Sequence, residues 1–430
     1  MYKLTGWLNN YWRQFATSIC LLSGLSLNAQ ESLTLDQAYD LARKNYPLIR
    51  QQELIQKTAD IKIDNLRKGL LPQMNFSAQA SYQSAVTEIK VPIPGVNIES
   101  LSKDQYKVIA DVSQVLYDGG VYREQKNMQQ LNASVEQQRV EVDLFKIRER
   151  ISQLFLGVLF VDEQLKQTDL IKTDINNGIK KVEAQVNNGV AFRSNLNLLQ
   201  AELLKADQRT IELKSSRKGL LQALGLFVNQ KFSDDQQLQL PSVTGNAESN
   251  TINRPEMRLF DSQNKMLSAQ SGLIKARNIP KASLFAQGGY AKPGLNFLKN
   301  EFDFYYIGGV RLNWNIGGLY TRKKERELIE VNKKGVEIQK ETFLLNTNAS
   351  LVQQQSEIDK MQQLINSDKQ IIDLRIKVKD AAKAQLENGV ITANDYLREI
   401  NAEDQARQSL ITHQLQLLQA QINYKNISGN

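Results

Sequence analysis

The chain has 430 residues, a mean hydropathy of −0.43 and a formal net charge of +8, and 23% of its residues are charged. After residue 29 it contains no run of 18 or more apolar residues, which excludes a membrane protein built from spanning helices. Basic residues alternate with acidic ones along the chain, so no concentrated positive face indicates binding to nucleic acid.

Residues 1–29 have the pattern of a secretory signal peptide. Lys3 and Arg13 supply positive charge, Phe15 to Leu27 form an apolar segment, and Ala29 precedes the expected cleavage point. The only cysteine, Cys20, lies inside this segment, so the processed chain would hold no disulfide and no thiolate metal site. The sequence therefore predicts an exported protein.

The rest of the chain reads as two copies of one unit. Four proline and glycine marks recur in the same order at a shift of about 200 residues, which chance matches do not produce. The matched marks are Tyr46-Pro47 with Arg254-Pro255, Leu71-Pro72 with Ile279-Pro280, Gly119-Gly120 with Gly317-Gly318, and Asn188-Gly189-Val190 with Asn388-Gly389-Val390. We predict a first copy over residues 30–224, an irregular linker over 225–252 and a second copy over 253–430.

Each copy begins with a helix that is followed by a β-hairpin. Pro47 and Pro255 suit the first helical position, and Pro72 and Pro280 end the helix because proline cannot continue it. Apolar and polar residues then alternate, which predicts hairpins at about 73–117 and about 281–316. The apolar sets are Phe76, Ala78, Ala80, Tyr82; Tyr106, Val108, Ala110, Val112, Leu116; Leu284, Ala286, Gly288, Tyr290; and Phe302, Phe304, Tyr306, Gly308, Val310, Leu312, Trp314, Ile316. Val91 to Asp104 is expected to be a loop that lengthens the first hairpin.

After each glycine pair the apolar residues recur every three or four positions, which predicts coiled-coil-like helices over Val121–Val186 and Leu319–Leu386. Turns at about 187–195 and about 387–395 form the helical tips, and returning helices follow near Ser194–Leu224 and Asn394–Tyr424. The fold class is thus mostly α with a small β part, arranged as duplicated long helical hairpins with four strands.

Strands of about ten residues with one apolar face are long enough to cross a bilayer when tilted. A sheet in lipid cannot keep open edges, and the smallest membrane barrels have about eight strands, so four strands cannot close alone. We therefore expect several chains to share one barrel, and three chains would give twelve strands. The alternative is a soluble periplasmic coiled-coil scaffold or adaptor, which would share the helices but would not need two such hairpins.

Several motifs resemble the TolC family of outer-membrane efflux channels over roughly Leu33 to Tyr424. They are Leu33-Thr34-Leu35-Asp36-Gln37-Ala38, Asn45-Tyr46-Pro47, Gln114-Val115-Leu116-Tyr117-Asp118-Gly119-Gly120, Asn313-Trp314-Asn315-Ile316-Gly317-Gly318 and the two tips. The resemblance implies a homotrimer in the outer membrane of a Gram-negative bacterium, with a twelve-stranded barrel in outer-membrane lipid and a periplasmic helical tunnel. It also implies passive conduction of cargo that an inner-membrane pump delivers through a periplasmic adaptor protein, with no nucleic-acid partner.

The same resemblance places adaptor contact and gating at the tips. Asp395 and Arg398 lie six and nine residues after Gly389, where the family can carry carboxylates that line the constriction, and Asn195 is the first-copy equivalent of Asp395. From the residues alone, Asp395 has two open roles, because Thr392 and Asp395 also have capping-box spacing. The predicted tip residues are Asn188, Gly189, Val190, Ser194 (as N-cap), Asn195, Asn388, Gly389, Val390, Thr392, Asp395 and Arg398. The predicted strand–helix junction residues are Pro72, Gly119, Gly120, Pro280, Gly317 and Gly318, whose glycines let the chain bend.

Enzymatic chemistry finds no support in the sequence. The single histidine, His413, lies in the last predicted helix, and no metalloprotease, phosphate-loop, nucleophile-elbow or dinucleotide motif occurs. We expect no catalytic residue, cofactor or metal. The basic cluster Arg322, Lys323, Lys324 and Arg326 suits a solvated helix face, and at the base of a barrel it would meet anionic head groups.

Overall fold

The computed structural model describes residues 32–88, 100–242 and 251–430. The elements are α2 (Leu35–Asn45), η1 (Pro47–Ile49), α3 (Arg50–Lys68), β1 (Gln73–Tyr82), β2 (Asp104–Tyr117), α4 (Val121–Asn187), α5 (Arg193–Val228), α6 (Pro255–Arg277), β3 (Lys281–Lys292), β4 (Asp303–Asn313), α7 (Gly318–Glu387) and α8 (Ala393–Ser428). The predicted signal peptide lies outside the described residues, as do most of the predicted loop after β1 and part of the linker. The chain divides into two compact units, and α4 and α7 each contribute residues to both.

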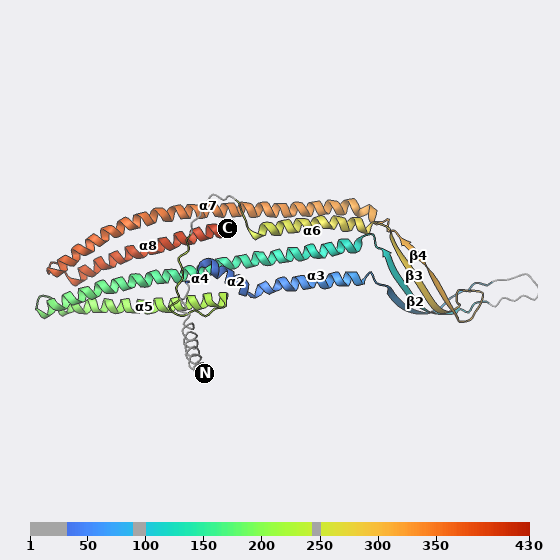
Figure 1. Ribbon diagram of the computed structural model, residues 1–430, viewed down its shortest axis with the longest axis horizontal. Helices are drawn as coiled ribbons and strands as arrows, with labels where there is room; N and C mark the ends of the chain where they lie inside the picture. Colours follow the sequence, from blue (N-terminus) through green and yellow to red (C-terminus); the bar gives the residue numbers. More distant parts are fainter. Residues whose placement is uncertain (1–31, 89–99, 243–250) are drawn as a thin grey trace, which may run out of the picture. The chain divides into compact units, whose positions relative to one another are not determined.

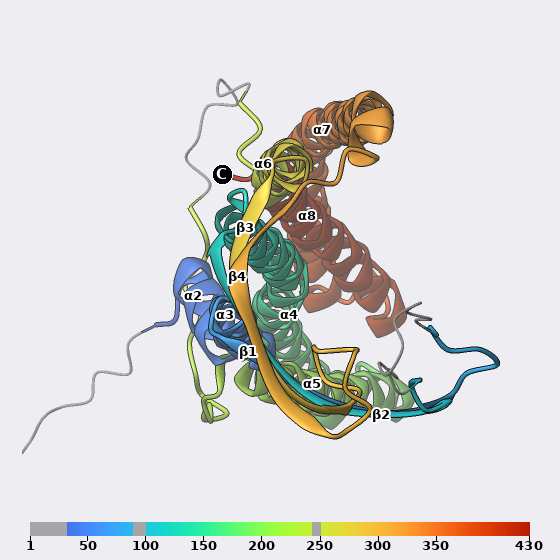
Figure 2. The ribbon, with the colours of Figure 1, turned by 90° about the vertical axis from the view of Figure 1, so that its right-hand side faces the viewer.

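One unit contains the sheet and comprises Pro47–Lys146, Asn250–Val352 and Ile427–Asn430. Its four strands are antiparallel in the order β1-β2-β3-β4 (Figures 1 and 2). The hairpins β1–β2 and β3–β4 are those that the alternation predicts, one from each copy. In addition, β2 pairs with β3 from Tyr106↔Lys292 to Tyr117↔Ala282, so the two copies form one continuous sheet.

The register of the sheet separates an apolar face from a polar face. Along one row of partners Val108 faces Tyr290, which faces Phe304, and the rings of Tyr290 and Phe304 lie 4.4 Å apart. Along a row on the other face the Gln287 amide donates to Asp111 at 2.8 Å. Within the strands the predicted apolar residues therefore fall on one face, because partner residues share a side of the pleat. Leu116 is the exception, since the register shifts between Val115 and Tyr117. The last predicted strand is shorter than expected: it ends at Asn313, and the Trp314 indole donates to the Asn278 carbonyl instead.

The two strand–helix junctions are built differently although their sequences match. Gly119 and Gly120 have φ values of 74° and 83°, and the Asp118 carboxylate accepts from the Gly120 and Tyr122 amides at 2.8 and 2.6 Å. At the second junction glycine is required because a side chain would not fit: a Cβ on Gly318 would lie 2.2 Å from the Asn278 side-chain oxygen. Only the first pair therefore uses the left-handed backbone that glycine permits.

The helices that precede the sheet begin differently in the two copies. α6 begins with Pro255 in its first turn, as the sequence predicts. In the first copy the prediction was wrong: Pro47 opens a short 3₁₀ turn, and the α-helix starts only at Arg50. An additional helix, α2, precedes it, with Thr34 and Gln37 forming a capping box. Tyr46 ends α2 in an extended conformation, which the following proline favours.

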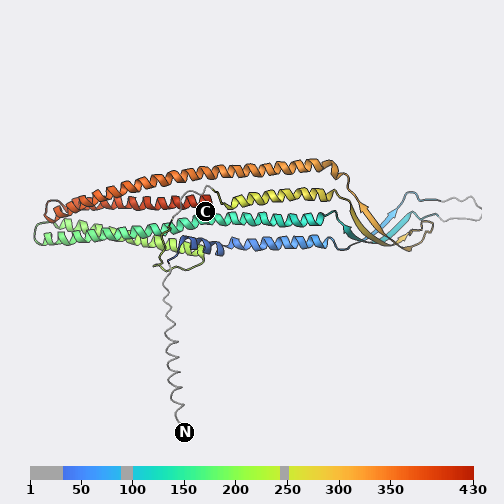
Figure 3. The ribbon, with the colours of Figure 1, turned by 45° about the horizontal axis from the view of Figure 1, so that its top comes forward.

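The other unit comprises Met1–Tyr46, Ile147–Ser249 and Gln353–Asn426. In it α4 runs antiparallel to α5, and α7 runs antiparallel to α8 (Figures 1 and 3). One core gathers residues of α2, α4, α5 and α8, among them Ala38, Phe155, Leu224 and Ile422. A second core lies next to the two tips and is described below. Among the described residues, none of the helices combines the length and hydrophobicity needed to cross a membrane.

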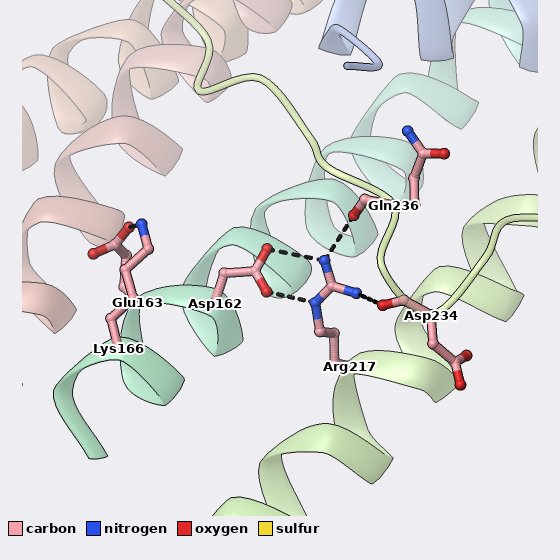
Figure 4. Close-up of polar contacts among 6 residues, drawn as sticks. All are labelled: Asp162, Glu163, Lys166, Arg217, Asp234 and Gln236. Carbon is pink, nitrogen blue, oxygen red and sulfur yellow. Dashed lines mark hydrogen bonds and ion pairs between the residues drawn. The ribbon is translucent and has the colours of Figure 1, made fainter. Parts of the chain in front are cut away.

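An arginine fixes the start of the linker to the first helical pair (Figure 4). Arg217 on α5 pairs with the Asp162 carboxylate on α4 and donates to the backbone oxygens of Asp234 and, at 2.7 Å, Gln236. A parallel bridge between Leu33 and Leu238 then joins this segment to the start of the chain. α5 itself ends at Val228, four residues into the predicted linker, where Asn229 is left-handed with φ 55°.

Candidate functional site

The helical tips form two turns with the same backbone geometry. Gly189 and Gly389 follow α4 and α7 with φ values of 74° and 73°. The Gly189 amide donates to Val186 and the Val190 amide to Gln185, at 3.0 and 2.8 Å, and the matching bonds of the second tip differ by at most 0.1 Å. This is the Schellman arrangement that closes a helix on a left-handed residue. The predicted turns are therefore present, and nothing lies within 4 Å of a Cβ built on either glycine.

Both tips expose apolar side chains. Val190 and Val390 are each 71% exposed, and Phe192 of the first tip is 81% exposed. In a Schellman turn the residue after the glycine often packs against the helix that it closes. Here Gln185 and Gln385 occupy the partner positions, which offers the two valines no apolar side chain there. The asparagines Asn188 and Asn388 are also exposed, so each turn presents a mixed apolar and polar surface.

The helices that leave the two tips start differently. In the second tip Thr392 and Asp395 form a reciprocal capping box: the Thr392 amide and hydroxyl donate to Asp395 Oδ2 at 3.1 and 2.7 Å, and the Asp395 amide donates to the Thr392 hydroxyl at 3.3 Å. In the first tip the prediction of Ser194 as N-cap was wrong. The N-cap is Phe192, which has no side-chain acceptor, and Ser194 lies inside α5 because the helix begins at Arg193, two residues earlier than an N-cap at Ser194 requires.

The capping contacts account for the electrostatics of Asp395. Hydrogen bonds from the Thr392 side chain and backbone stabilise the carboxylate and lower the pKa of Asp395, with a further contribution from Arg398. Arg398 itself is exposed and pairs with Glu399 at 3.3 Å. Asn195, the first-copy equivalent of Asp395, is partly exposed, and its backbone amide donates to the Phe192 carbonyl at 3.0 Å. Of the two predicted constriction positions, Asp395 and Arg398, only Asp395 carries a carboxylate, so each chain supplies one carboxylate there.

A core next to the tips joins all four helices of this unit, and the sequence analysis did not find its centre. Tyr396 of α8 is only 1% exposed, and burial raises its pKa to about 12. Gly178 of α4 makes room for it, since a Cβ there would lie 3.2 Å from the Tyr396 ring. The members of this core are Ile175, Val182, Leu199, Ala382, Leu386, Ala393, Tyr396, Leu397 and Ile400.

A buried ion-pair network connects three of the same helices. Lys379 on α7 lies 2.8 Å from Asp174 on α4 and 2.7 Å from Glu403 on α8, and Arg407 contacts Glu403 at 2.6 Å. The Lys379 and Glu403 side chains are 13% and 6% exposed. Burial opposes the charge on Lys379, but hydrogen bonds to its two carboxylate partners outweigh it and raise its pKa. Burial likewise opposes the charge on Glu403, yet Lys379 and Arg407 lower its pKa.

A second candidate site consists of surfaces of the sheet unit that one chain leaves open. β1 and β4 have one neighbour each, and the apolar face exposes side chains such as Phe76 (71%), Phe304 (79%) and Tyr306 (87%). On α7, apolar side chains repeat every seven residues and stay 58–69% exposed. They are Val331, Ile338, Leu345 and Val352. Spacing of seven is the seam of a coiled coil, so this stripe fits another helix.

His413 has no role that indicates catalysis. Its ring lies 2.6 Å from Asp368 on α7, which is an ordinary interhelical contact. In the part of the chain that the structure describes, no group of three histidine, cysteine or acidic side chains could hold a metal ion.

Comparisons with known proteins agree with this geometry. Residues 38–229 match the family described as outer membrane efflux protein. The fold is similar to that of CusC, studied for conformational changes accompanying folding and transmembrane channel formation, with a TM-score of 0.66, 14% identity and coverage of 94% of this chain and 95% of CusC. It is also similar to the outer-membrane channel OprN, with a TM-score of 0.65, 13% identity and coverage of 92% of this chain and 89% of OprN. The Campylobacter jejuni outer membrane channel CmeC gives a TM-score of 0.61, 15% identity and coverage of 92% of this chain and 85% of CmeC. A search of curated protein sequences finds no significant match.

The comparisons show the fold of an outer-membrane channel subunit, with the long helical hairpins and the four-stranded sheet that these channels share. The predicted resemblance agrees with both comparisons: residues 38–229 match the outer membrane efflux protein family, and nearly the whole chain has the fold of the TolC-like channels. The family and the similar structures are channel proteins.

Proposed function

We propose that three copies of this chain close a shared twelve-stranded barrel and conduct cargo passively, with no catalytic step of their own. The observation that carries this proposal is the two-faced sheet with unpaired β1 and β4 edges. In lipid every backbone amide and carbonyl needs a partner, and only closure supplies partners to the edges. The heptad stripe on α7 gives the neighbouring copies a helical seam as well.

The native mass of protein extracted by detergent from outer membranes tests the assembly. We expect three processed chains per particle. Ile338→Glu and Leu345→Glu together place charges in the α7 stripe and should reduce the trimer fraction, whereas Gln339→Glu, an exposed neighbour, should not. A water-soluble monomer, or a trimer indifferent to the stripe substitutions, would contradict the proposed assembly.

We further propose that the two tips contact a periplasmic adaptor protein and that polar residues near them close the tunnel. The exposed Val190, Phe192 and Val390 offer apolar surface at turns whose helices are otherwise packed. Fully buried apolar contacts surrounded by polar groups are typical of such interfaces. The pump would meet this chain only indirectly, through the adaptor.

Site-specific crosslinking tests the tips. Because Cys20 is the only cysteine, a cysteine introduced at Val190 or Val390 gives a single reactive thiol in a processed chain. We expect both variants to crosslink to the adaptor encoded with the pump that this channel serves. Leu328→Cys is the matched control, since Leu328 is 60% exposed but lies in the unit that holds the sheet. Equal crosslinking from all three positions would count against adaptor contact at the tips.

A further inference from the structure

The start of α7 carries positive charge that the chain does not neutralise. Lys324 pairs with Glu327 at 2.7 Å, and Glu325 accepts a hydrogen bond from Thr321. Within the described parts of the chain, no hydrogen-bond or ion-pair partner is found for Arg322, Lys323 or Arg326. Positions 322 and 326 are one helical turn apart, and so are 323 and 326, so the three side chains share one face of α7.

This charge begins directly after the first turn of α7. The N-terminal end of a helix carries partial positive charge and favours acidic residues. α4 follows that rule with Glu124 in its first turn, whereas α7 has no acidic residue in its first turn and three basic residues directly after it. An external anion at this position would offset the repulsion.

The first copy provides a contrast at the equivalent junction. There Arg67 and Lys68 both pair with Asp64, at 2.5 and 3.0 Å, and Arg123 pairs with Glu124 at 3.0 Å. Lys126 is left as a single basic residue without such a partner in the described structure. The second junction adds Lys275 and Arg277, both exposed in the last turn of α6. The second junction therefore carries more unpaired basic side chains than the first in the described structure.

The surroundings of the basic face are apolar and aromatic. Trp314, Ile316 and Tyr320 come just before it in the chain and are 54%, 51% and 84% exposed. They follow β4, whose apolar face would lie in lipid in the proposed barrel. Exposed tryptophan and tyrosine followed by basic residues are typical of the boundary between hydrocarbon and head groups.

We propose that Arg322, Lys323 and Arg326 form a binding site for the phosphate head group of an anionic phospholipid in the periplasm-facing leaflet. Each guanidinium group can donate two parallel hydrogen bonds to the oxygens of one phosphate, and the lysine adds a positive point charge. The site would hold the second junction of each chain at the membrane surface, while the neutralised first junction would have no such preference. This inference rests on the sheet lying in the outer membrane and is independent of adaptor contact at the tips.

The test uses the detergent-extracted, full-length processed protein and phosphatidylglycerol as the probe. Retained lipid molecules are counted by native mass spectrometry after titration with phosphatidylglycerol or with phosphatidylcholine. We expect wild-type protein to retain phosphatidylglycerol in preference to phosphatidylcholine, and Arg322→Gln/Lys323→Gln/Arg326→Gln to lower its apparent affinity about tenfold or more. The matched control is Arg67→Gln/Lys68→Gln/Arg123→Gln, which removes as many charges from the first junction and should leave the affinity unchanged.

Equal retention of the two lipids by wild-type protein would overturn the proposal, and so would an equal loss of affinity in both triple variants. Competition with purified lipopolysaccharide tests whether the phosphate comes from the opposite leaflet. If lipopolysaccharide displaces phosphatidylglycerol at equal concentration, the assignment to a phospholipid of the periplasm-facing leaflet is overturned. Should the triple variant not assemble, Arg326→Gln alone and the salt dependence of wild-type binding decide the question, since retention must fall as salt screens the charges. Crosslinking through Val190→Cys should persist in the triple variant, which separates this test from the adaptor proposal.

Discussion

The two tips show what a duplicated unit keeps and what it changes. Both copies keep the glycine turn, because no other backbone closes α4 and α7 with the same hydrogen bonds. The copies differ in how the next helix starts: Thr392 and Asp395 cap α8, whereas Phe192 leaves α5 without a side-chain cap. The turn is thus fixed by backbone conformation, and the residues that follow it are free to diverge.

The same divergence continues inside the core and makes the two hairpins complementary. The second hairpin contributes the large or charged groups, Tyr396, Lys379 and Glu403. The first contributes the space and the counter-charge, Gly178 and Asp174. At the position that matches Tyr396, the first copy has Leu196. Each hairpin therefore depends on the other for its packing, and substitutions at five positions can break or sharpen this contrast.

The largest effect is expected from Lys379→Met. Removal of the lysine leaves the buried carboxylate of Glu403 with Arg407 alone and deprives the partly exposed Asp174 of its partner, which should cost up to about 3 kcal/mol. We expect faster amide hydrogen exchange in the parts of α4 and α8 next to the tips. The control is Lys181→Met, whose exposed contact with Glu387 should be worth about 1 kcal/mol or less.

The pH dependence of the same network has a defined sign. Because the pKa of Glu403 is lowered in the folded protein, its stabilising contribution is present above its ordinary value of 4.5 and is lost as the pH falls through the folded-state pKa. Glu403→Gln should remove that acid dependence. If amide hydrogen exchange accelerates equally at low pH in the wild-type protein and in Glu403→Gln, the network has no stabilising role.

Gly178→Val should come next. The added Cβ would lie 3.2 Å from the buried Tyr396 ring, and overpacking of this kind costs about 1–3 kcal/mol. The second substitution Tyr396→Leu, which copies the residue of the first tip, should restore most of the lost stability. Denaturant or thermal unfolding of the helical unit checks both variants, and a double variant no better than the single one would refute direct packing of the pair.

Gly389→Val tests whether the turn geometry is needed for transport. A β-branched residue at φ 73° costs about 1–2 kcal/mol locally, and the space around the glycine is open, so the sheet should remain intact. We expect loss of export with unchanged trimer mass. Gly189→Val probes the first tip in the same way, and normal export by either variant would remove that tip from the functional assignment.

The smallest effect distinguishes the two roles of Asp395. Asp395→Asn keeps an acceptor for Thr392 but removes the charge, and it reproduces Asn195 of the first tip. If the carboxylate also gates, single-channel recordings should show higher conductance or weaker cation dependence for this variant. Asp395→Ala removes the cap as well and should add fraying of α8. Wild-type conductance in Asp395→Asn would leave the residue with capping alone.

Much of the fold follows from local signals in the sequence. Pro72 and Pro280 end helices, alternation defines the strands, and Gly189 and Gly389 mark turns, because each acts through its own backbone or its immediate neighbours. Thr392 and Asp395 could be predicted as a cap for the same reason. The error at Ser194 has a local cause too, since a helix boundary shifts by a residue without any change in composition.

What the sequence does not reveal are contacts between distant segments. The pairing of β2 with β3 joins residues from different copies, and no alternation pattern specifies that neighbour. The Lys379–Asp174 contact spans 205 residues, and neither residue stands out on its own helix. Tyr396 reads as one more aromatic residue at helical spacing, and only its position against Gly178 shows that it lies at the centre of a core.

The open edges of β1 and β4 also set an order of events in biogenesis. A lone chain that entered the bilayer would carry two rows of unsatisfied peptide groups into hydrocarbon, where water cannot solvate them. In the proposed assembly, chains must therefore meet one another before or during insertion, and the rate of insertion should depend on chain concentration with an order above one. Before they meet, the open edges are templates for incorrect strand pairing, so this interval is the one in which aggregation is expected.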